Sequence, residues 1–295
     1  MADSGKRLRA TALGGLAVLL WALLALFTAG SGLVPPFQLA ALSFCVASLI
    51  GLLFWRIRRE DPRLYLRQPW PVWALGIGGL FGYHFFYFLA LRHAPAVEAS
   101  LIAYLWPLLI VLFSGLLPGE RLGWHHLAGA LLGFAGAGLL VTGGEGFGFR
   151  SEFALGYGAA IVCALTWSGY SVLSRRFQAV PTGMVTLYCI ATSALATAAH
   201  LAFEDTHWPE TVWQWAAVLG LGLGPVGAAF FFWDHGVKHG HIQALGASSY
   251  AAPLLSTLVL VVAGLAQATW VVAVACLLIT AGAVLASKDL LRRRI

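Results

Sequence analysis

The segment Tyr104-Leu105-Trp106-Pro107-Leu108-Leu109 has a counterpart in Tyr250-Ala251-Ala252-Pro253-Leu254-Leu255, 146 residues further along the chain. Other residues match at the same offset without gaps: Trp21 with Trp167, Phe85 with Phe231, His93 with His239, and Trp124 with Trp270. Matches of Leu or Ala mean little in so apolar a chain, whereas repeated Trp, His, Tyr and Pro are informative. The offset therefore indicates a duplicated structural unit.

The composition places this duplicated unit in a membrane. Of the 295 residues, 60% are hydrophobic and only 10% are charged, whereas about a quarter of an ordinary soluble domain is charged. Roughly 20 apolar residues cross a bilayer as a helix. The apolar runs predict an all-α integral membrane protein with ten transmembrane helices, at 10–29, 34–55, 71–92, 97–116, 122–142, 154–175, 182–203, 212–235, 242–263 and 267–287.

The distribution of Lys and Arg predicts the orientation of these helices. With a cytoplasmic N-terminus, 16 of the 18 basic residues lie on the cytoplasmic side and only Arg92 and Arg150 lie on the other. This bias is the usual one for membrane proteins, and with ten spans it puts both termini in the cytoplasm. It also accounts for the net charge of +6, so the lipid bilayer is the expected partner and nucleic acid is not.

Ten spans and one offset divide the chain into two five-helix units, residues 1–150 and 151–295. Because five is an odd number, the second unit enters the membrane from the opposite side, which makes the repeat inverted. Inverted repeats are typical of transporters that expose a site near the midplane to each side in turn. The alternative is a duplication that was retained for packing alone.

The chain resembles the EamA-type transporters of the drug/metabolite transporter superfamily along essentially its whole length. Within that superfamily, the segments Phe85-Phe86-Tyr87-Phe88-Leu89-Ala90-Leu91, His93-Ala94-Pro95 and Tyr104-Leu105-Trp106-Pro107 are similar to the bacterial aromatic amino-acid exporter branch. The resemblance implies a multi-pass protein of the bacterial inner membrane, with a central cavity lined mainly by the first, third, fourth, sixth, eighth and ninth helices. It also implies that the fourth and ninth helices participate in gating.

Aromatic residues deep in the spans are the candidate substrate-binding residues. Tyr83 and Tyr87 are four residues apart and share a helix face, and His84 lies beside them near the middle of the span. The full candidate set is Trp21, Tyr83, His84, Tyr87, Tyr104, Trp106, Trp167 and Tyr250. Aromatic rings with a few hydroxyls suit a flat, amphipathic ligand. The alternative for the tyrosines is ordinary packing, and for His84 a proton relay or an interhelical hydrogen bond.

Two prolines are candidate kink and gating positions. Proline removes a backbone hydrogen bond and kinks a helix, and Pro107 and Pro253 lie at matching positions in the fourth and ninth spans.

The remaining tryptophans and ionisable residues carry weaker expectations. Nine tryptophans near span ends are expected to form interfacial belts: Trp55, Trp70, Trp73, Trp124, Trp208, Trp213, Trp215, Trp233 and Trp270. Asp234 and His235 are likewise interpreted as interfacial. The four cysteines, in apolar runs and without a C-x-x-C pair, are interpreted as small core residues. No pair of deep carboxylates indicates a proton or sodium relay, so proton coupling and passive exchange both stay open.

The function that these features favour is export of small metabolites, most of all aromatic or other amino acids, by alternating access. A broader metabolite or drug exporter is the alternative. An intramembrane enzyme would need a nucleophile and base, a metal site or paired carboxylates, and no such motif is present. The sequence therefore predicts no catalytic residue, no metal and no cofactor. Small residues are spread over many helix faces, so no oligomeric state is favoured.

Overall fold

The computed structural model describes residues 2–146 and 148–288, and within them every regular element is a helix. Up to residue 146 the elements are α1 (Ala2–Trp21), α2 (Leu24–Gly30), α3 (Pro36–Arg58), α4 (Arg63–Leu66), α5 (Trp70–Ile77), the π-helix η1 (Gly78–Gly82), α6 (Tyr83–His93), α7 (Ala96–Ala103), α8 (Trp106–Ser114) and α9 (Trp124–Thr142). From residue 148 they are the 3-10 helix η2 (Ser151–Phe153), α10 (Ala154–Leu173), the 3-10 helices η3 (Ser174–Phe177) and η4 (Thr182–Met184), α11 (Val185–Phe203), α12 (Val212–Leu223), the π-helix η5 (Gly224–Ala228), α13 (Ala229–His239), α14 (Ile242–Ser248), α15 (Ala251–Val262) and α16 (Trp270–Ala286).

These elements combine into membrane-crossing stretches that confirm the predicted all-α membrane fold. In the described part of the chain, 9 helical stretches are long and apolar enough to span a bilayer. A tenth, α16, is apolar but has 17 residues. At about 1.5 Å per residue it rises about 26 Å, slightly less than the roughly 30 Å of a hydrocarbon core. The predicted spans and the observed helical stretches correspond one to one.

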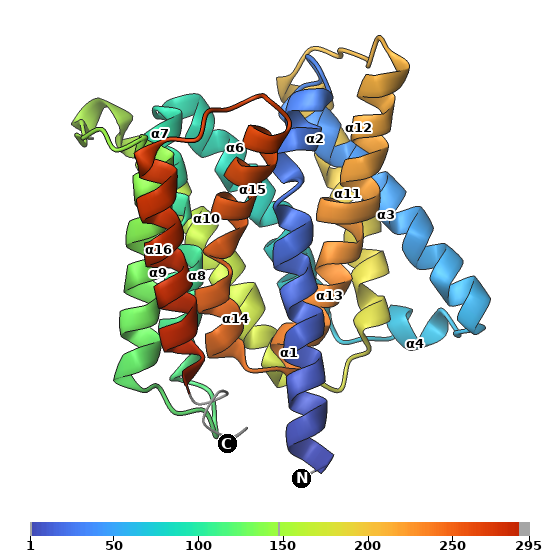
Figure 1. Cartoon of the computed structure of the whole chain (residues 1–295). Helices are drawn as coiled ribbons and strands as arrows, with labels where there is room; N and C mark the ends of the chain where they lie inside the picture. Colours follow the sequence, from blue (N-terminus) through green and yellow to red (C-terminus); the bar gives the residue numbers. More distant parts are fainter. Residues whose placement is uncertain (1, 147, 289–295) are drawn as a thin grey trace.

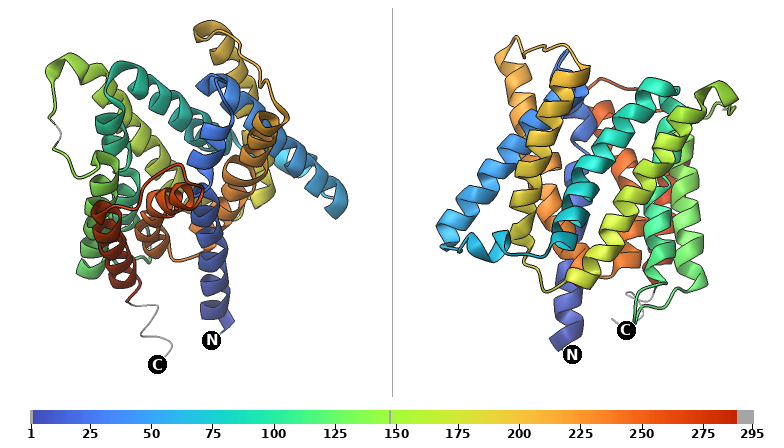
Figure 2. Two further views of the ribbon diagram at one scale, coloured as in Figure 1. Left: turned by 45° about the horizontal axis from the view of Figure 1, so that its top comes forward. Right: turned by 180° about the vertical axis from the view of Figure 1, so that it is seen from behind.

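Helices far apart in the sequence pack side by side. The most extensive contacts pair α9 with α16, α3 with α11, α1 with α13, and α6 with α10. Each pair joins a helix before residue 147 to one after it, and Figure 1 shows α9 and α16 running together along one edge of the bundle. Figure 2 shows α3 and the short α4 at the opposite edge. The N-terminus and the last turn of α16 lie at the same end of the molecule (Figure 1), which we call the N-terminal face.

Glycines allow two of these pairs to approach at backbone distance. A Cβ placed on Gly282 of α16 would lie 2.5 Å from the carbonyl oxygen of Gly129 in α9. A Cβ on Gly236 of α13 would lie 2.5 Å from Cα of Gly14 in α1. Small residues at such crossings are the usual means of packing helices in lipid, where no hydrophobic force drives them together.

Several spans are interrupted in the membrane, and the interruptions share the offset of the sequence repeat. The span that contains Pro107 breaks between α7 and α8, and the span that contains Pro253 breaks between α14 and α15. Both prolines fall in the first turn after the break. The two π-helices, η1 and η5, were not predicted from the sequence; each lies just before the helix that supplies residues to the candidate site described below.

Three sequence-based interpretations of burial are wrong. Trp55 and Trp233 were expected at the membrane interface, but both are buried. The Trp55 ring stacks on Tyr65 of α4 with centroids 4.4 Å apart, and Trp233 faces the interior of the bundle. Cys45 was expected in the core, but it is exposed on α3, and the four cysteines are unpaired. Position along a span does not reveal which face of a helix turns inward. Other tryptophans of the predicted belts are exposed: Trp70, Trp124, Trp208, Trp213, Trp215 and Trp270.

Candidate functional site

A cluster of tryptophans from four helices lies in the interior of the bundle. The Trp21 ring of α1 has its centroid 6.0 Å from Trp106 of α8 and 6.0 Å from Trp167 of α10. It lies 5.1 Å from Trp233 of α13. Most of these rings meet edge to face, the arrangement that the aromatic quadrupole favours. The structure thus brings together all three tryptophans that the sequence singled out as deep, and adds a fourth.

The first helical turns of α6 bring Tyr83 and His84 to this cluster. The Tyr83 ring lies 5.5 Å from Trp167 and 5.3 Å from His84. His84 in turn packs edge to face on Phe44 of α3 at 5.2 Å and on Phe230 of α13 at 6.3 Å. We call the set Trp21, Phe44, Tyr83, His84, Trp106, Trp167, Phe230 and Trp233 the aromatic cluster.

Hydrogen bonding fixes the tautomer of His84. Its Nδ1 atom lies 2.7 Å from the carbonyl oxygen of Leu80. A carbonyl oxygen can only accept, so Nδ1 carries a proton, and in the neutral ring Nε2 is an acceptor. His84 therefore presents a lone pair, and no proton, on the side of the ring away from Leu80.

Both π-helices border the aromatic cluster. The π-helix η1 directly precedes Tyr83, and its Gly79 packs so closely that a Cβ would lie 2.5 Å from the Tyr170 ring. The π-helix η5 contains Pro225, whose carbonyl oxygen accepts a hydrogen bond from Nε1 of Trp21 at 3.1 Å. A π-turn shifts the register of the residues that follow and leaves backbone groups free, which is why such turns recur at functional sites.

Several polar atoms of the cluster have no partner within residues 2–146 and 148–288. No hydrogen bond in that part of the chain reaches Nε2 of His84, the indole N–H groups of Trp106 and Trp167, or the hydroxyl of Tyr83. None of these atoms is fully enclosed. Unpaired polar groups in an apolar interior are unfavourable unless something satisfies them, which makes this set a candidate ligand site.

Three predicted tyrosines lie at or beyond the edge of the cluster. The Tyr87 ring stacks on Tyr83 at 6.1 Å, and its hydroxyl pairs with Ser100 of α7 at 3.2 Å. Tyr104 is the half-buried residue at the break before α8. Tyr250 packs away from the cluster, beside Phe134 of α9 at 6.2 Å. Its hydroxyl is bonded to the backbone of Tyr104 and Leu108, which assigns it to the break and separates it from the other candidates.

Sequence reasoning missed Phe44, Phe230 and Trp233. Two of them carry a signal in the repeat, because adding the 146-residue offset to His84 and Tyr87 leads to Phe230 and Trp233. Aromatic side chains at matching positions of α6 and α13 therefore line the cluster from both sides. Phe44 has no such signal, since its counterpart at that offset is Ile190.

A buried ion pair lies one residue beyond Trp233. The Asp234 carboxylate contacts Nζ of Lys238 at 2.9 Å, with the two side chains 1% and 3% exposed. Tyr170 donates to the other carboxylate oxygen at 3.3 Å, and Lys238 donates to the carbonyl oxygen of Val180 at 3.1 Å. The interpretation of Asp234 as interfacial is thus wrong: the i, i+4 spacing lets Lys238 neutralise it inside the protein.

In the described segments, no three His, Cys, Asp or Glu side chains converge in a geometry that could hold a metal ion. The side chains of the aromatic cluster can bind a ligand by ring packing and by hydrogen bonds from or to uncharged groups.

The sequence and the fold of this chain are similar to those of known proteins. The model of the EamA-like transporter family matches residues 9–142 and 154–288. The chain is 54% identical over 289 residues to an aromatic amino acid exporter, YddG, of Ancylobacter novellus, covering 98% of this chain and 99% of that protein. It is 27% identical to the aromatic amino acid exporter YddG of Escherichia coli K12, covering 85% of this chain and 87% of the relative. A crystal structure at 53% identity covers 95% of this chain and 98% of its own, with a TM-score of 0.90.

Proposed function

The chain belongs to the EamA-like transporter family, and we propose that it exports aromatic amino acids across a bacterial inner membrane. The observation that carries the proposal is the set of unpartnered polar atoms on His84, Trp106 and Trp167 within a cluster of aromatic rings. The relatives named as exporters of aromatic amino acids support the same substrate class.

An aromatic amino acid complements the cluster at each of its parts. Its ring packs among the tryptophans, where edge-to-face contacts contribute about 0.5–1.5 kcal/mol per pair beyond area burial. Its ammonium donates to Nε2 of His84, the acceptor left by the Nδ1 bond to Leu80. Its carboxylate accepts from the indole N–H groups of Trp106 and Trp167 and from the Tyr83 hydroxyl. No member of the cluster is a carboxylate, a lysine or an arginine, which suits a zwitterion of zero net charge.

Alternating access rests on the proposal that residues 1–150 and 151–295 form two inverted repeats. The breaks before α8 and before α15, and the π-helices η1 and η5, recur at a sequence offset of about 146 residues. The main helix pairs join one half to the other, so a movement of one half against the other would rearrange the aromatic cluster. Pro107 and Pro253, next to the breaks, are the proposed hinges. The proposed orientation places both termini in the cytoplasm, in agreement with the bias of Lys and Arg.

Transport by purified protein in liposomes tests the substrate. Liposomes loaded with unlabelled phenylalanine should accumulate labelled tryptophan by exchange, and glutamate or lysine should not compete. We expect W167A to lose most of the exchange, while the matched variant W213A, at an exposed tryptophan of α12, exchanges like the unchanged protein. Absence of aromatic amino-acid flux, with folded protein in the liposomes, would rule out the substrate.

Competition in the same liposome assay distinguishes an aromatic amino-acid exporter from the alternative, an exporter of a broader range of metabolites or drugs. Uncharged aromatic compounds that lack the amino-acid group would then compete as strongly as tryptophan. We expect weaker competition, because such compounds leave Nε2 of His84 without a donor.

A separate labelling experiment tests the orientation. Single cysteines at exposed Arg59 and exposed Trp213 lie at the two ends of the spans. In intact cells, a membrane-impermeant maleimide should label position 213 and leave position 59 unlabelled. The reverse result would invert the proposed orientation and leave the substrate untouched.

A further inference from the structure

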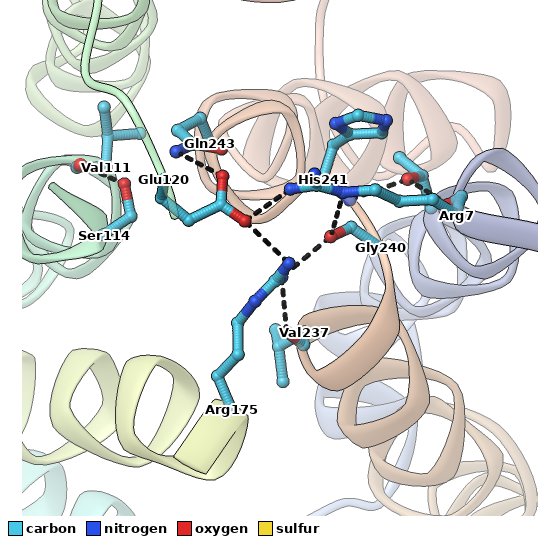
Figure 3. A network of polar contacts seen from close by, with 10 residues as sticks. Arg7, Val111, Ser114, Glu120, Arg175, Val237, Gly240, His241 and Gln243 are labelled. Carbon is cyan, nitrogen blue, oxygen red and sulfur yellow. Dashed lines mark hydrogen bonds and ion pairs between the residues drawn. The ribbon is translucent and has the colours of Figure 1, made fainter. Parts of the chain in front are cut away.

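The N-terminal face contains a polar network centred on Glu120 (Figure 3). One carboxylate oxygen of Glu120 accepts from the guanidinium of Arg7 in α1 and from that of Arg175 in η3, the latter at 2.7 Å. The other accepts from the side-chain amide of Gln243 in α14 at 3.1 Å. Three helical elements thus direct donors at one carboxylate, in a geometry of charge-assisted hydrogen bonds.

The two guanidinium groups are held in place by contacts that do not involve Glu120. Arg175 donates to the carbonyl oxygens of Val237 at 3.0 Å and Gly240 at 2.7 Å, at the carboxyl end of α13. Arg7 also donates to Gly240, at 3.4 Å. Carbonyls at a helix carboxyl end attract cations. These contacts preorganise the two guanidinium groups independently of Glu120.

Glu120 differs from its partners because it lies in a loop. The loop connects α8 to α9, and its Gly119 has φ of +80°, a left-handed conformation. The side chain of Glu120 is 10% exposed, against 32% for Arg7 and 16% for Arg175. Two guanidinium groups face a single carboxylate, so the network keeps an excess positive charge. The α8–α9 loop thus places the Glu120 carboxylate among donors that belong to helices.

The repeat has no second copy of this network. At the 146-residue offset, Glu120 corresponds to Ala266, and Arg175 corresponds to Ala29. The site is therefore specific to the N-terminal face, and packing common to both halves does not explain it.

We propose that Arg7, Arg175 and Gln243 form a carboxylate-binding site on the N-terminal face, and that Glu120 is its tethered occupant. When this face opens, the carboxylate of an arriving amino acid takes the place of Glu120. The amino acid as cargo rests on the proposed function, whereas the carboxylate site does not.

Exchange of one carboxylate for another explains how cargo would promote opening. If Glu120 left alone, two partly buried guanidinium groups would lose their partner, which is costly. A free carboxylate restores those hydrogen bonds, so it favours the open form by the difference in its affinity for the two forms. Glu120 joins the α8–α9 loop of the first half to η3 and α14 of the second, so its release would free this loop from the second half.

Thermal unfolding of purified variants tests the site without any transport assay. E120A leaves the donors unoccupied, and we expect formate to raise its melting midpoint by about 2 °C or more. Formamide, which has the same shape but no charge, should not. The unchanged protein, whose site is filled, should not respond to formate. E152A removes the carboxylate of an exposed ion pair with Arg150 and serves as the matched control, with no expected response.

A second variant keeps the test decisive if E120A does not fold. E120Q retains the length of the side chain but removes its charge, and formate should stabilise it as well. The double variant E120A/R175Q should lose the response. If formate stabilises neither single variant, or if formamide acts equally, Glu120 is only a structural tie and the proposed site is wrong. Failure of the liposome assay with aromatic amino acids would leave a positive formate result intact, so the two proposals fail separately.

Discussion

The hydroxyl of Tyr250 donates a hydrogen bond to the carbonyl oxygen of Tyr104 at 3.2 Å, across 146 residues of sequence. The same hydroxyl accepts from the backbone N–H of Leu108 at 3.1 Å. In an uninterrupted α-helix, the N–H of Leu108 would bond directly to the carbonyl of Tyr104. The phenol of Tyr250 thus occupies the gap in the helical ladder and satisfies both of its ends, one of the recognised causes of a helix break.

Removal of this hydroxyl should destabilise the protein. In Y250F the N–H of Leu108 and the carbonyl of Tyr104 lose their shared partner, and a buried group without a hydrogen bond costs about 1–3 kcal/mol. We expect the free energy of unfolding in detergent to fall by about that amount.

The control for this variant is its counterpart in the repeat, Y104F. Its hydroxyl makes no hydrogen bond to residues 2–146 or 148–288, so its loss should change the free energy of unfolding by less than about 0.5 kcal/mol. An equal fall in the free energy of unfolding of Y250F and Y104F would show that the hydrogen bonds of the Tyr250 hydroxyl do not stabilise the protein.

Substitution of Gly282 should weaken the packing of α9 against α16. In G282A the new Cβ would lie 2.5 Å from the carbonyl oxygen of Gly129 and 2.9 Å from the backbone nitrogen of Gly133. Backbone atoms cannot move aside as a flexible side chain can, so the helices must separate. Overpacking of this kind costs about 1–3 kcal/mol, measurable as a lower melting midpoint.

Gly158 of α10 provides the matched control, because nothing lies within 4 Å of a Cβ added there. We expect G158A to be neutral or to stabilise the protein by up to about 1 kcal/mol, since alanine favours the helix. A G282A protein as stable as G158A would contradict the close approach of α9 and α16.

Substitution of His84 should change which ligands are preferred. Because Nε2 of His84 is the acceptor proposed for the ammonium, the unchanged protein should bind tryptophan more tightly than indole-3-propionate, which lacks that group. A hydrogen bond to a charged partner contributes about 1.5–3 kcal/mol, so in H84A this preference should fall by roughly tenfold or more. Binding titrations of both compounds measure it. If both ligands weaken equally, His84 shapes the site without contacting the ammonium.

The Asp234–Lys238 pair should be costly to break and inexpensive to replace. K238M leaves the Asp234 carboxylate, 1% exposed, without its cation, and loss of one member of a buried pair costs about 3–5 kcal/mol. The double variant D234N/K238M removes both charges and should regain most of that loss, as shown by a double-mutant cycle on the free energy of unfolding. A double variant as unstable as the single one would show that the charges themselves, rather than their balance, are required.

The architecture could be predicted from the sequence because a membrane makes the hydrophobic pattern explicit. Apolar runs, the bias of Arg and Lys, and the repeated Tyr104 and Tyr250 led to ten spans and to breaks beside Pro107 and Pro253. Five of the eight candidate residues belong to the aromatic cluster, because a Trp or His deep in a span is seldom turned toward lipid. Tyr87 and Tyr104 lie beside it.

The rest depends on which side of each helix faces inward, and local sequence does not encode that. Trp233 lies near the end of its span and so resembled an interfacial residue, yet α13 turns it to the centre. Tyr250 was expected to contact substrate, but the place of its hydroxyl depends on a helix more than 140 residues away. Glu120, in a short loop, gave no sign that Arg7 and Arg175 would meet there, because the contact with Arg175 exists only after both halves have packed.

The insertion of the Tyr250 hydroxyl at the break between α7 and α8 also affects how the chain is assembled. A ribosome adds about 5–20 residues per second, so Tyr250 is synthesised roughly 7–30 s after Tyr104, given the 146 residues between them. By the end of that interval the first five helices have been synthesised, while the N–H of Leu108 and the carbonyl of Tyr104 still lack the hydroxyl of Tyr250. Pro107 already bends the nascent span, because proline cannot complete the helical ladder. The hydrogen bonds that satisfy this break are therefore formed late in biosynthesis, when the two halves of the protein first meet.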